Sequence, residues 1–552
     1  MEQRELIPES QAGFRKGRRT VDNIFILSHV VQREREKEEE GKERKVFAFF
    51  VDLKAAFDNV NREKLWELME RWSINGNIID RLKGIYRETR AAIRTKDGLS
   101  EEIKTRKGVR QGCVLSPILF NMYIAEIDKY LDVRGIGGIK IGKERIWSLA
   151  YADDLILLAK NKEAVTDMMG TLRRFLKDRK LDLNVEKSKV MVFNSGGREK
   201  KRKWIWEGKE IEEVQNFKYL GFTFNKRGDY ASHIKELRRK GRMAANIVWG
   251  IGERMCKNDF TRRWILFRYL VESVMAYGVE IWGWEERKEL EKILLDYMRW
   301  MFKLDFCTPR YLVTRELGLG KLRVEWGIRA RRYEEKIEEM GEERWVKMCW
   351  REKRRDGWKG VYGKEREKYY NRNGWGVSAI DSMPRAERNL IEELRERESD
   401  VQAQEEESRI KEARYNRRYK EFRKENGVPR YIEEGIVRGG KRGEGIRALI
   451  RLRCGNMEND NKYWLEEEKR TCIFCKEGKD NMEHFIGECR IVMEWFVGLG
   501  ENTRDRIREL ENEELDEKKE GLLIKFWKEK EKLRRKEEEE TKEKEKAMRF
   551  KE

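Results

Sequence analysis

Short apolar runs separated by charged segments fill the first part of the chain and predict a domain of strands and helices. Val46–Leu53 (VFAFFVDL) is apolar on both faces, which predicts a buried central strand with Asp52 at its end. The runs WSLA and LILLA flank a short polar tip, Asp153-Asp154, and predict a β-hairpin. Adjacent acids are common in solvated turns. An acid that ends a buried strand is harder to explain by packing alone.

Other patterns place helices and a second hairpin around these strands. The segments AAIRT and EEIKT, joined around Asp97-Gly98, predict a hairpin. After the turn GVRQGC we expect a helix with Ser116 as its N-cap and Pro117 as its first residue. Helical periodicity predicts further helices from about residue 20, over 61–72, over 77–88 and over 162–179.

The second part of the chain has no strand signals. Residues 230–333 are helical in pattern and rich in Trp, Met, Arg and Lys, which predicts a helical bundle with basic outer faces. Residues 334–430 are dominated by Glu, Lys and Arg and predict a charged helical connector. Beyond Phe526 the mixed-charge tail is typical of a solvated helix or a disordered segment.

Composition narrows the class of partner. A chain of 552 residues is long enough for more than one domain. Its 124 Lys and Arg against 104 Asp and Glu give a net charge of +20, which favours nucleic acid over membrane as a partner, although a solvated charged surface is the alternative. The start MEQRELIPES lacks an apolar signal core and no apolar run spans a bilayer. We therefore expect an intracellular protein of the nucleus or cytoplasm, not a secreted one.

The acids at the predicted strand ends suit metal-dependent phosphoryl transfer. If the strand and the hairpin are neighbours in one sheet, Asp52, Asp153 and Asp154 converge on one edge. Carboxylate oxygens without His or Cys suit Mg²⁺, and the backbone carbonyl of Leu53 could add a ligand. Two such ions about 3.5–4 Å apart can activate an attacking hydroxyl and stabilise a leaving oxygen. The chain has no P-loop motif, and its three His are scattered.

A Cys/His cluster lies near the end of the chain. Cys472, Cys475, His484 and Cys489 have the spacing of one structural, tetrahedral Zn²⁺ site, whereas Cys454 lies outside it. Surrounding basic residues favour nucleic-acid binding as the use of this site, and a folding role alone is the alternative. The scattered cysteines are expected to be buried small hydrophobes: Cys113, Cys256, Cys307 and Cys349.

The motifs, taken in order, resemble those of a known family. They are FAFFVDLKAAFD (47–58), RQGCVLSPILFN (110–121), YADDLILL (151–158), LNVEKSKVMVF (183–193) and FKYLGF (217–222), preceded by QAGFRKGRRTVDNIFIL (11–27). In this order and spacing they resemble the successive palm motifs of reverse transcriptases of non-LTR (LINE-type) retrotransposons. The resemblance is strong over about residues 3–225 and weaker over 230–340, which resembles the thumb. The Cys/His cluster resembles the C-terminal motif of the same family.

The resemblance implies an α+β fold of the right-hand polymerase type. It implies an RNA-directed DNA polymerase that uses an RNA template, a DNA primer, deoxynucleoside triphosphates and two Mg²⁺. The expected segments are partial fingers and palm (1–195), a primer-grip hairpin region (196–229), a helical thumb (230–340), a charged connector (341–450), the zinc motif (451–500) and a charged tail (501–552).

The resemblance also assigns roles to single residues near the acids. Asp52 matches the catalytic acid of the first motif, and Asp153 and Asp154 match the YxDD pair. Phe57 falls at the aromatic steric gate that excludes a ribose 2′-OH, although its apolar context also allows a core position. Lys187 matches a lysine that could neutralise or protonate the pyrophosphate, with a solvated lysine, or Lys189 in its place, as alternatives. The remaining matches contact the nucleotide (Leu53, Ala56, Arg110, Gln111, Gly112) or form the primer grip (Tyr219, Leu220, Gly221).

The chain departs from the family pattern at its start. Family members usually carry an endonuclease domain and the first fingers motifs before the segment with which this chain begins. We therefore expect the product of an N-terminally truncated element or a partial gene. Two alternatives to a working polymerase stay open: an inactive remnant that binds RNA or DNA, and a polymerase adopted by its host.

Overall fold

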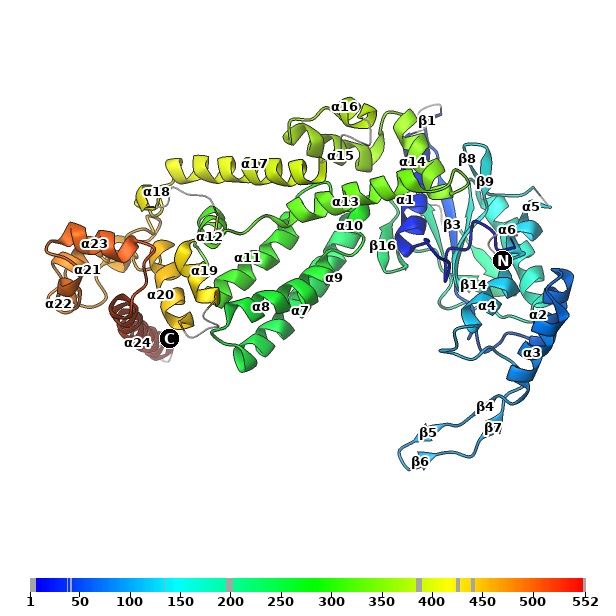
Figure 1. The fold of residues 1–552 in the computed structure, drawn as a ribbon, viewed down its shortest axis with the longest axis horizontal. Helices are drawn as coiled ribbons and strands as arrows, with labels where there is room; N and C mark the ends of the chain where they lie inside the picture. Colours follow the sequence, from blue (N-terminus) through cyan, green and yellow to red (C-terminus); the bar gives the residue numbers. More distant parts are fainter. Residues whose placement is uncertain are drawn as a thin grey trace. The chain divides into compact units, whose positions relative to one another are not determined.

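The structure is a computed structural model that describes residues 6–549 except 37, 40–41, 134, 195–201, 384–389, 423–426 and 438–441. It divides into two compact units (Figure 1). Unit 1 comprises Met1–Glu236, Gly278–Glu285 and Arg329–Tyr369, and unit 2 comprises Leu237–Tyr277, Glu286–Ile328 and Tyr370–Glu552. The segment boundaries expected from the sequence stay a prediction. Those at 1, 195–196 and 552 lie outside the described residues.

A four-stranded antiparallel sheet forms the centre of unit 1. Its strand order is β10 (Ser148–Tyr151), β11 (Asp154–Ala159), β3 (Val46–Val51), β12 (Lys189–Phe193). Every residue of β3 is buried, as predicted for a central strand. Regular pairing ends at Val51, short of the predicted end, and Leu53 forms only an isolated bridge to Leu183.

The two faces of the sheet have different neighbours. Phe47, Phe49 and Val51 point into a core shared with the helices that follow β3 in the sequence. On the opposite face, the ring of Phe50 stacks on Phe217 with 4.2 Å between centroids. The helices of the first face are α2 (Arg62–Arg71), α3 (Gly76–Arg87), α4 (Ser116–Ile124), α5 (Ile127–Asp132) and α6 (Lys162–Asp178). The opposite face meets the hairpin β15 (Asn216–Tyr219)–β16 (Phe222–Asn225) and helix α1 (Thr20–Glu36).

The helices of unit 1 begin close to the residues predicted from the sequence, except for α4. The side chains of Asn61, Asn75 and Asn161 accept backbone hydrogen bonds at the starts of α2, α3 and α6, as capping requires. The prediction for α4 was wrong, because its N-cap is Leu115 and Ser116 is already helical. The buried Ser116 hydroxyl donates instead to the carbonyl of Arg110 at 2.6 Å, so it secures the preceding turn.

Short antiparallel pairs complete the strands of unit 1. The predicted hairpin around Asp97-Gly98 is confirmed, and Figure 1 shows that it extends beyond α3, away from the central sheet. It consists of β4 (Arg90–Ala91) paired with β7 (Ile103–Lys104), then β5 (Arg94–Thr95) paired with β6 (Gly98–Leu99). The other pairs are β1 (Glu38–Glu39) with β2 (Lys42–Glu43), β8 (Ile139–Ile141) with β9 (Glu144–Ile146), and β13 (Trp204–Trp206) with β14 (Lys209–Ile211).

Residues far along the chain return to α1 within unit 1. Helix α14 (Trp345–Arg355) places Glu352 at 2.8 Å from both His29 Nε2 and Arg33 Nη1. The hydroxyl of Tyr333 donates to Asp22 at 2.9 Å. Part of the predicted charged connector is therefore a packed element of unit 1, together with α10 (Val279–Trp282).

The regular elements that the structure describes in unit 2 are all helices, and Thr471 and Lys479 form an isolated β-bridge. Three of the five boundaries between the units fall inside helices, namely α7 (Ala231–Met255), α13 (Leu322–Glu339) and α15 (Gly360–Arg372). Unit 2 contains α8 (Phe260–Phe267), the π-helical η2 (Arg268–Glu272), α9 (Ser273–Met275), α11 (Lys288–Phe302), α12 (Arg310–Leu317), α16 (Val377–Ser382), α17 (Leu390–Glu412), α18 (Tyr419–Phe422), α19 (Arg430–Val437), α20 (Gly443–Arg453), the 3₁₀ turns η4 (Glu467–Arg470) and η5 (Val497–Leu499), α21 (Met482–Gly487), α22 (Met493–Phe496), α23 (Thr503–Glu511) and α24 (Glu517–Arg549). None of the helices described is both long and apolar enough to span a bilayer.

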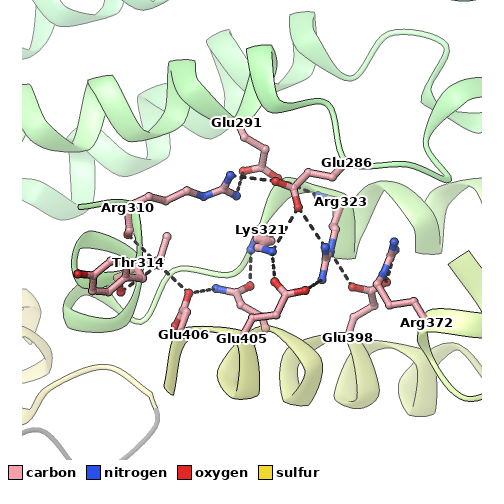
Figure 2. A network of polar contacts seen from close by, with 12 residues as sticks. Glu286, Glu291, Arg310, Thr314, Lys321, Arg323, Arg372, Glu398, Glu405 and Glu406 are labelled. Carbon is pink, nitrogen blue, oxygen red and sulfur yellow. Dashed lines mark hydrogen bonds and ion pairs between the residues drawn. The ribbon is translucent and has the colours of Figure 1, made fainter. Parts of the chain in front are cut away.

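Helix α17 is docked mainly by polar side chains. Its buried positions recur every fourth residue: Leu390, Leu394, Glu398, Gln402, Glu406 and Ile410. Glu398 accepts from Arg323 Nε at 2.9 Å and from Arg372, and Gln402 accepts from the backbone N–H of Lys321 at 2.9 Å. Figure 2 shows the α17 side chains pointing toward Lys321 and Arg323. The helix therefore has a buried stripe that an apolar periodicity search does not detect.

Replacing Glu398 by Gln should destabilise unit 2. Glu398 is fully buried, and its loss of charge leaves two guanidinium groups with one fewer counter-charge. We expect the free energy of unfolding to fall by about 3 kcal/mol, the usual cost of breaking a buried pair. Urea unfolding followed by circular dichroism measures the change. The exposed Glu396→Gln on the same helix is the control, and equal stability of the two variants would contradict the docking role.

Candidate functional site

The pairing of β3 with β11 brings the predicted acids to one edge of the sheet. Leu155 lies opposite Val51, so the next position along the same ladder sets Asp154 opposite Asp52. Tyr151 pairs with Asp154 across β10 and β11, which leaves Ala152 and Asp153 as a two-residue turn. Directly opposed residues in a sheet share a face. Asp52 and Asp154 are therefore on one side of the sheet.

The three carboxylates interact as like charges. Partial burial raises the pKa of Asp154 to about 6, and the negative charges of Asp153 and Asp52 add to this rise. Within the described part of the chain no Lys or Arg forms an ion pair with any of them. A set of hard oxygen donors with uncompensated negative charge fits a divalent cation such as Mg²⁺.

The turn that carries Asp153 is held by a side chain from the start of the domain. Ala152 has φ of 59°, in the left-handed region, which costs free energy for a residue with a Cβ. The Ala152 N–H donates to Gln11 Oε1 at 2.9 Å, and Gln11 Nε2 donates to the Ala152 carbonyl at 3.1 Å. One carboxamide thus satisfies both backbone groups of the strained residue.

The backbone around Gln11 extends the sheet beside β10. The Ala12 N–H donates to the Ala150 carbonyl at 2.9 Å, and the Ala150 N–H donates to the Ser10 carbonyl at 2.8 Å. A Cβ on Gly13 would lie 2.3 Å from the Ala152 nitrogen, so only glycine permits this approach.

Two further buried amides complete this frame, and sequence reasoning missed all three. Asn121 Nδ2 donates to the Gly13 carbonyl at 2.7 Å, and Asn23 Nδ2 donates to the Ala150 carbonyl at 3.1 Å. Gln11, Asn23 and Asn121 are each at most 3% exposed. One feature of the sequence could have indicated them. Each is an amide side chain inside or beside an apolar run, where a solvent-exposed residue is unusual.

The predicted primer-grip hairpin lies beside the acids. Tyr219 is buried, and its hydroxyl accepts a hydrogen bond from Asn23 Nδ2 at 3.2 Å. Burial raises the pKa of Tyr219, and the negative charge of Asp154 adds to the rise. Leu220 and Gly221, with φ of 46° and 82°, form the tight turn of the hairpin.

The segment that carries Lys187 lies against the other side of Asp52. The Asp52 N–H donates to Ser188 Oγ at 3.0 Å, and the Asp52 carbonyl accepts from the Asn184 N–H at 2.8 Å. Lys187 is exposed, whereas Lys189 forms an ion pair with Glu212 at 2.8 Å. Lys189 is thus the less available of the two lysines that the sequence suggested.

The predicted nucleotide-contacting residues form a neighbouring group. Ala56 is buried, and the half-buried ring of Phe57 stacks on Phe120 with 4.5 Å between centroids. This position is compatible with both a steric gate and a core role. Gln111 Nε2 donates to the Asp58 carboxylate at 3.1 Å, in an exposed turn. Gly112 follows with φ of 81°, which favours glycine there.

The predicted zinc ligands converge in unit 2. The ligand atoms of Cys472, Cys475, His484 and Cys489 all lie within 4.8 Å of one another, and the residues are buried. The Cys475 Sγ to His484 Nε2 distance is 3.1 Å, and the two other sulfurs are 3.9 Å apart. Zn–S bonds of about 2.3 Å and Zn–N bonds of about 2.0 Å in a tetrahedron give similar separations.

Local features prepare this cluster for a metal. His484 Nδ1 lies 3.3 Å from Glu488, which leaves Nε2 as the ligand atom. Burial raises the pKa of the Cys475 thiol, but the backbone N–H groups of Glu477 and Gly478 outweigh it and lower that pKa to about 6. A Cβ on Gly478 would lie 2.2 Å from the His484 ring, so glycine is needed for the close approach.

The cysteines outside the cluster differ from the prediction. Only Cys349 of the four scattered cysteines is buried. Cys307 is exposed, and Cys113 and Cys256 are partly exposed, because these three lie in turns or at a helix end. Cys454 is buried and is not a member of the cluster, as expected.

Comparison with known families agrees with this geometry. The family described as reverse transcriptase (RNA-dependent DNA polymerase) matches residues 1–224. Those residues are a reverse transcriptase domain. The resemblance to enzymes of non-LTR retrotransposons is confirmed.

Individual relatives of the reverse transcriptase domain come from insect elements. A "Retrovirus-related Pol polyprotein from type-1 retrotransposable element R2" of Popillia japonica is 30% identical over 43% of this chain and 33% of its own length. A "Probable RNA-directed DNA polymerase from transposon BS" of Drosophila melanogaster is 25% identical over 61% of this chain and 37% of its own length. The chain thus spans about a third of the length of either relative.

A solved telomerase structure gives a weaker likeness. The apo telomerase of Candida tropicalis is 12% identical with a TM-score of 0.32, over 71% of this chain and 59% of its own. We draw no conclusion from a structural similarity with a TM-score this low.

Replacing Gln11 by Ala should disturb the turn that carries Asp153, and with it any DNA synthesis by this region, more than it impairs folding. The Ala152 backbone then loses both partners, and small displacements of catalytic groups can lower rates by about a hundredfold. We expect kcat to fall ten- to a hundredfold with little change in KM for the nucleotide, as measured by steady-state primer extension.

Gln32→Ala is the matched control for this variant. Gln32 is also a buried glutamine, in α1, and donates to Ser28 and Tyr230 rather than to the hairpin. Both variants should show a similar decrease in melting temperature. An equal fall in kcat in both would show that Gln11 acts through general stability only.

Proposed function

We propose that this chain is an RNA-directed DNA polymerase that adds deoxynucleotides to a DNA 3′ end on an RNA template. The observation that carries the proposal is the closeness of Asp52, which directly follows β3, to Asp154 at the start of the neighbouring strand β11, with Asp153 in the turn before it. These acids lie inside a reverse transcriptase domain. The relative from transposon BS is named as a probable enzyme of this class.

The proposal assigns metal binding to the acids. Asp52, Asp153 and Asp154 would hold two Mg²⁺, which supply charge stabilisation to an in-line phosphoryl transfer when bound. Because the pKa of Asp154 is about 6, its carboxylate is mostly ionised at neutral pH and is available as a ligand. Gln11 keeps the turn in place, and the buried Tyr219 lies close enough to Asp154 to interact with its charge.

We also propose that the elements around the acids have the layout of a right-hand polymerase. The central sheet of unit 1 would be the palm, and the hairpin β15–β16 would position the primer 3′ end. The helices of residues 230–340 would form the thumb. Phe57 would exclude a ribose 2′-OH, Arg110, Gln111 and Gly112 would contact nucleotide and template, and Lys187 would meet the pyrophosphate.

The proposal also places one structural Zn²⁺ at the Cys/His cluster of unit 2. The donor set of three thiols and one imidazole, with all ligand atoms within 4.8 Å, supports zinc over Mg²⁺. Lys476 and Arg490 lie next to two of the ligands in the sequence, but they form ion pairs with Glu537 and Glu477, so a nucleic-acid contact by this module would compete with these pairs.

Primer extension tests the polymerase. With Mg²⁺, an RNA template and an annealed DNA primer, Asp52→Asn and Asp154→Asn should each reduce extension at least about a hundredfold, because each removes a metal ligand. The exposed Asp182→Asn, in the same unit, should behave as the unsubstituted protein. If the unsubstituted protein extends the primer no more than Asp154→Asn does, but still binds RNA, the result would instead favour an inactive remnant that binds nucleic acid.

Metal analysis tests the zinc site. The purified protein should contain one zinc per chain, and Cys472→Ser should lose it and unfold at a lower temperature, because structural zinc contributes folding free energy. Cys307→Ser, an exposed cysteine outside the cluster, should retain the metal. Zinc-free protein of unchanged melting temperature would contradict this assignment.

A further inference from the structure

We propose that a polar cavity between the first turns of three helices of unit 2 binds the phosphate groups of a small anion, either a free polyphosphate or a nucleotide. The cavity has a volume of about 490 Å³, which is in the range of small-molecule sites. The proposal goes beyond the polymerase function, because every lining residue belongs to unit 2. Five cationic side chains line the cavity: Lys288, Arg310, Lys321, Arg323 and Arg409.

Four of these cations lie where a helix begins. Lys288 is the first residue of α11, Arg310 is the first residue of α12, and Lys321 and Arg323 flank the first residue of α13. The amino end of a helix carries partial positive charge, and neither α11 nor α12 has a side-chain N-cap. Helix ends and side chains thus bring positive charge to one cavity, an arrangement that favours an anion.

The carboxylates of the cavity neutralise part of this charge. Figure 2 shows Glu286 between three of the cations, and the ion-pair distances are 2.9 Å to Arg310, 3.2 Å to Lys321 and 3.0 Å to Arg323. Burial raises the pKa of Glu286, but the three cations outweigh burial and lower that pKa to about 2. The cations therefore produce a strongly positive potential at this point of the cavity.

The other two carboxylates compensate less of the charge. Glu405 pairs with Lys321 at 2.6 Å and is the nearer of the two to the cations. Glu406 accepts instead from the neutral side chains of Thr314 at 2.6 Å and Gln402 at 2.8 Å, and it forms no ion pair with any residue that the structure describes. Burial also raises the pKa of Glu406, which favours its neutral form.

Three of the cationic side chains retain capacity for a further anion. Lys288 and Arg409 are exposed and form no ion pair within the described part of the chain. Arg323 is only 4% exposed, yet its Nη2 donates no hydrogen bond, and the distance from this nitrogen to Glu405 is 3.9 Å. A buried N–H without an acceptor costs free energy, which an anion in the cavity would recover.

The lining favours phosphate over a singly charged anion. Five cations against three carboxylates leave an excess of two positive charges, so an anion with at least two negative charges balances the cavity. The guanidinium groups of Arg310 and Arg323 present the planar donors that match phosphate oxygens. Tyr311, which is half-buried, lines the same cavity and would give the base of a nucleotide a ring to stack on.

The test removes the two cations that have no counter-charge. Lys288→Gln/Arg409→Gln should fold normally, because both side chains are exposed and outside the network that holds α17. The full chain, without added Mg²⁺, is titrated with inorganic pyrophosphate by isothermal titration calorimetry. We expect one site per chain in the unsubstituted protein and at least about tenfold weaker binding in the variant, since hydrogen bonds to charged groups are strong.

Melting temperature gives a second measurement. A ligand that binds the folded state raises the melting temperature as its concentration exceeds Kd. We expect this rise with pyrophosphate in the unsubstituted protein and a much smaller rise in Lys288→Gln/Arg409→Gln. Sodium chloride at the same ionic strength should not reproduce it.

A charge-matched variant and a second ligand complete the design. Arg504→Gln/Lys528→Gln removes two exposed cations of unit 2 that have no ion pair among the described residues, and it should bind pyrophosphate normally. A deoxynucleoside triphosphate distinguishes the two sources of phosphate. Tighter binding than that of pyrophosphate would assign the site to a nucleotide, and weaker binding would assign it to a free polyphosphate.

Three results would overturn the proposal. Absence of binding heat in the unsubstituted protein, or an equal rise in melting temperature with sodium chloride, would show that the cavity is not a phosphate site. Equal affinity in the unsubstituted protein and in Lys288→Gln/Arg409→Gln would place the anion elsewhere. Weaker binding of a single-stranded RNA 20-mer by this variant, with unchanged affinity for pyrophosphate, would assign these cations to nucleic acid. None of these results depends on primer extension, which tests the polymerase separately.

Discussion

The antiparallel register between β3 and β11 is the constraint on which the site depends. Side chains alternate between faces of a sheet, so a slip of one residue would set Asp52 and Asp154 on opposite faces. The register is secured because both strands are buried along almost their whole length, and a slip would expose Phe49 or Leu157 to the wrong environment. Apolar packing therefore fixes the geometry of the most polar part of the domain.

Neutral groups hold both of the charged regions of unit 1. The acid-bearing turn is framed by the carboxamides of Gln11, Asn23 and Asn121, and the guanidinium groups of Arg62 and Arg110 are framed mainly by backbone carbonyls. An Arg at position 11 or a Glu beside Arg62 would also fix geometry, but it would cancel the charge. Neutral partners supply position without neutralisation, so the negative edge keeps its attraction for cations, and Arg62 and Arg110 keep their attraction for anions. In unit 2 the buried Glu398 is instead held by charged partners, Arg323 and Arg372, so the opposite charges cancel and stabilise the packing of α17.

The sequence predicted those parts of the molecule whose signals are local. The double-sided apolar run of β3 and the alternation around Asp97-Gly98 both arise from nearest neighbours along the chain. The role of Gln11 depends on a contact 141 residues away and has no local signature. Ser116 looked like an N-cap, but its hydroxyl donates to the carbonyl of Arg110 in the preceding turn and does not cap the helix. The buried stripe of α17 escaped notice because half of its members are polar. Convergence of Cys472, Cys475, His484 and Cys489 was predictable, since their spacing is itself local.

The pairing of Ser10–Ala12 with Ala150 has a consequence for synthesis of the protein. The early segment leaves the ribosome long before its partner strand exists, and about 140 residues separate the two. At roughly 5–20 residues per second, the delay is on the order of ten to thirty seconds. During that time the backbone groups of the first segment have no sheet to join, and such unpaired edges are prone to associate with other chains. Completion of this acidic edge of the sheet is therefore a late event in biogenesis, and until then the backbone groups of Ser10–Ala12 lack their sheet partner.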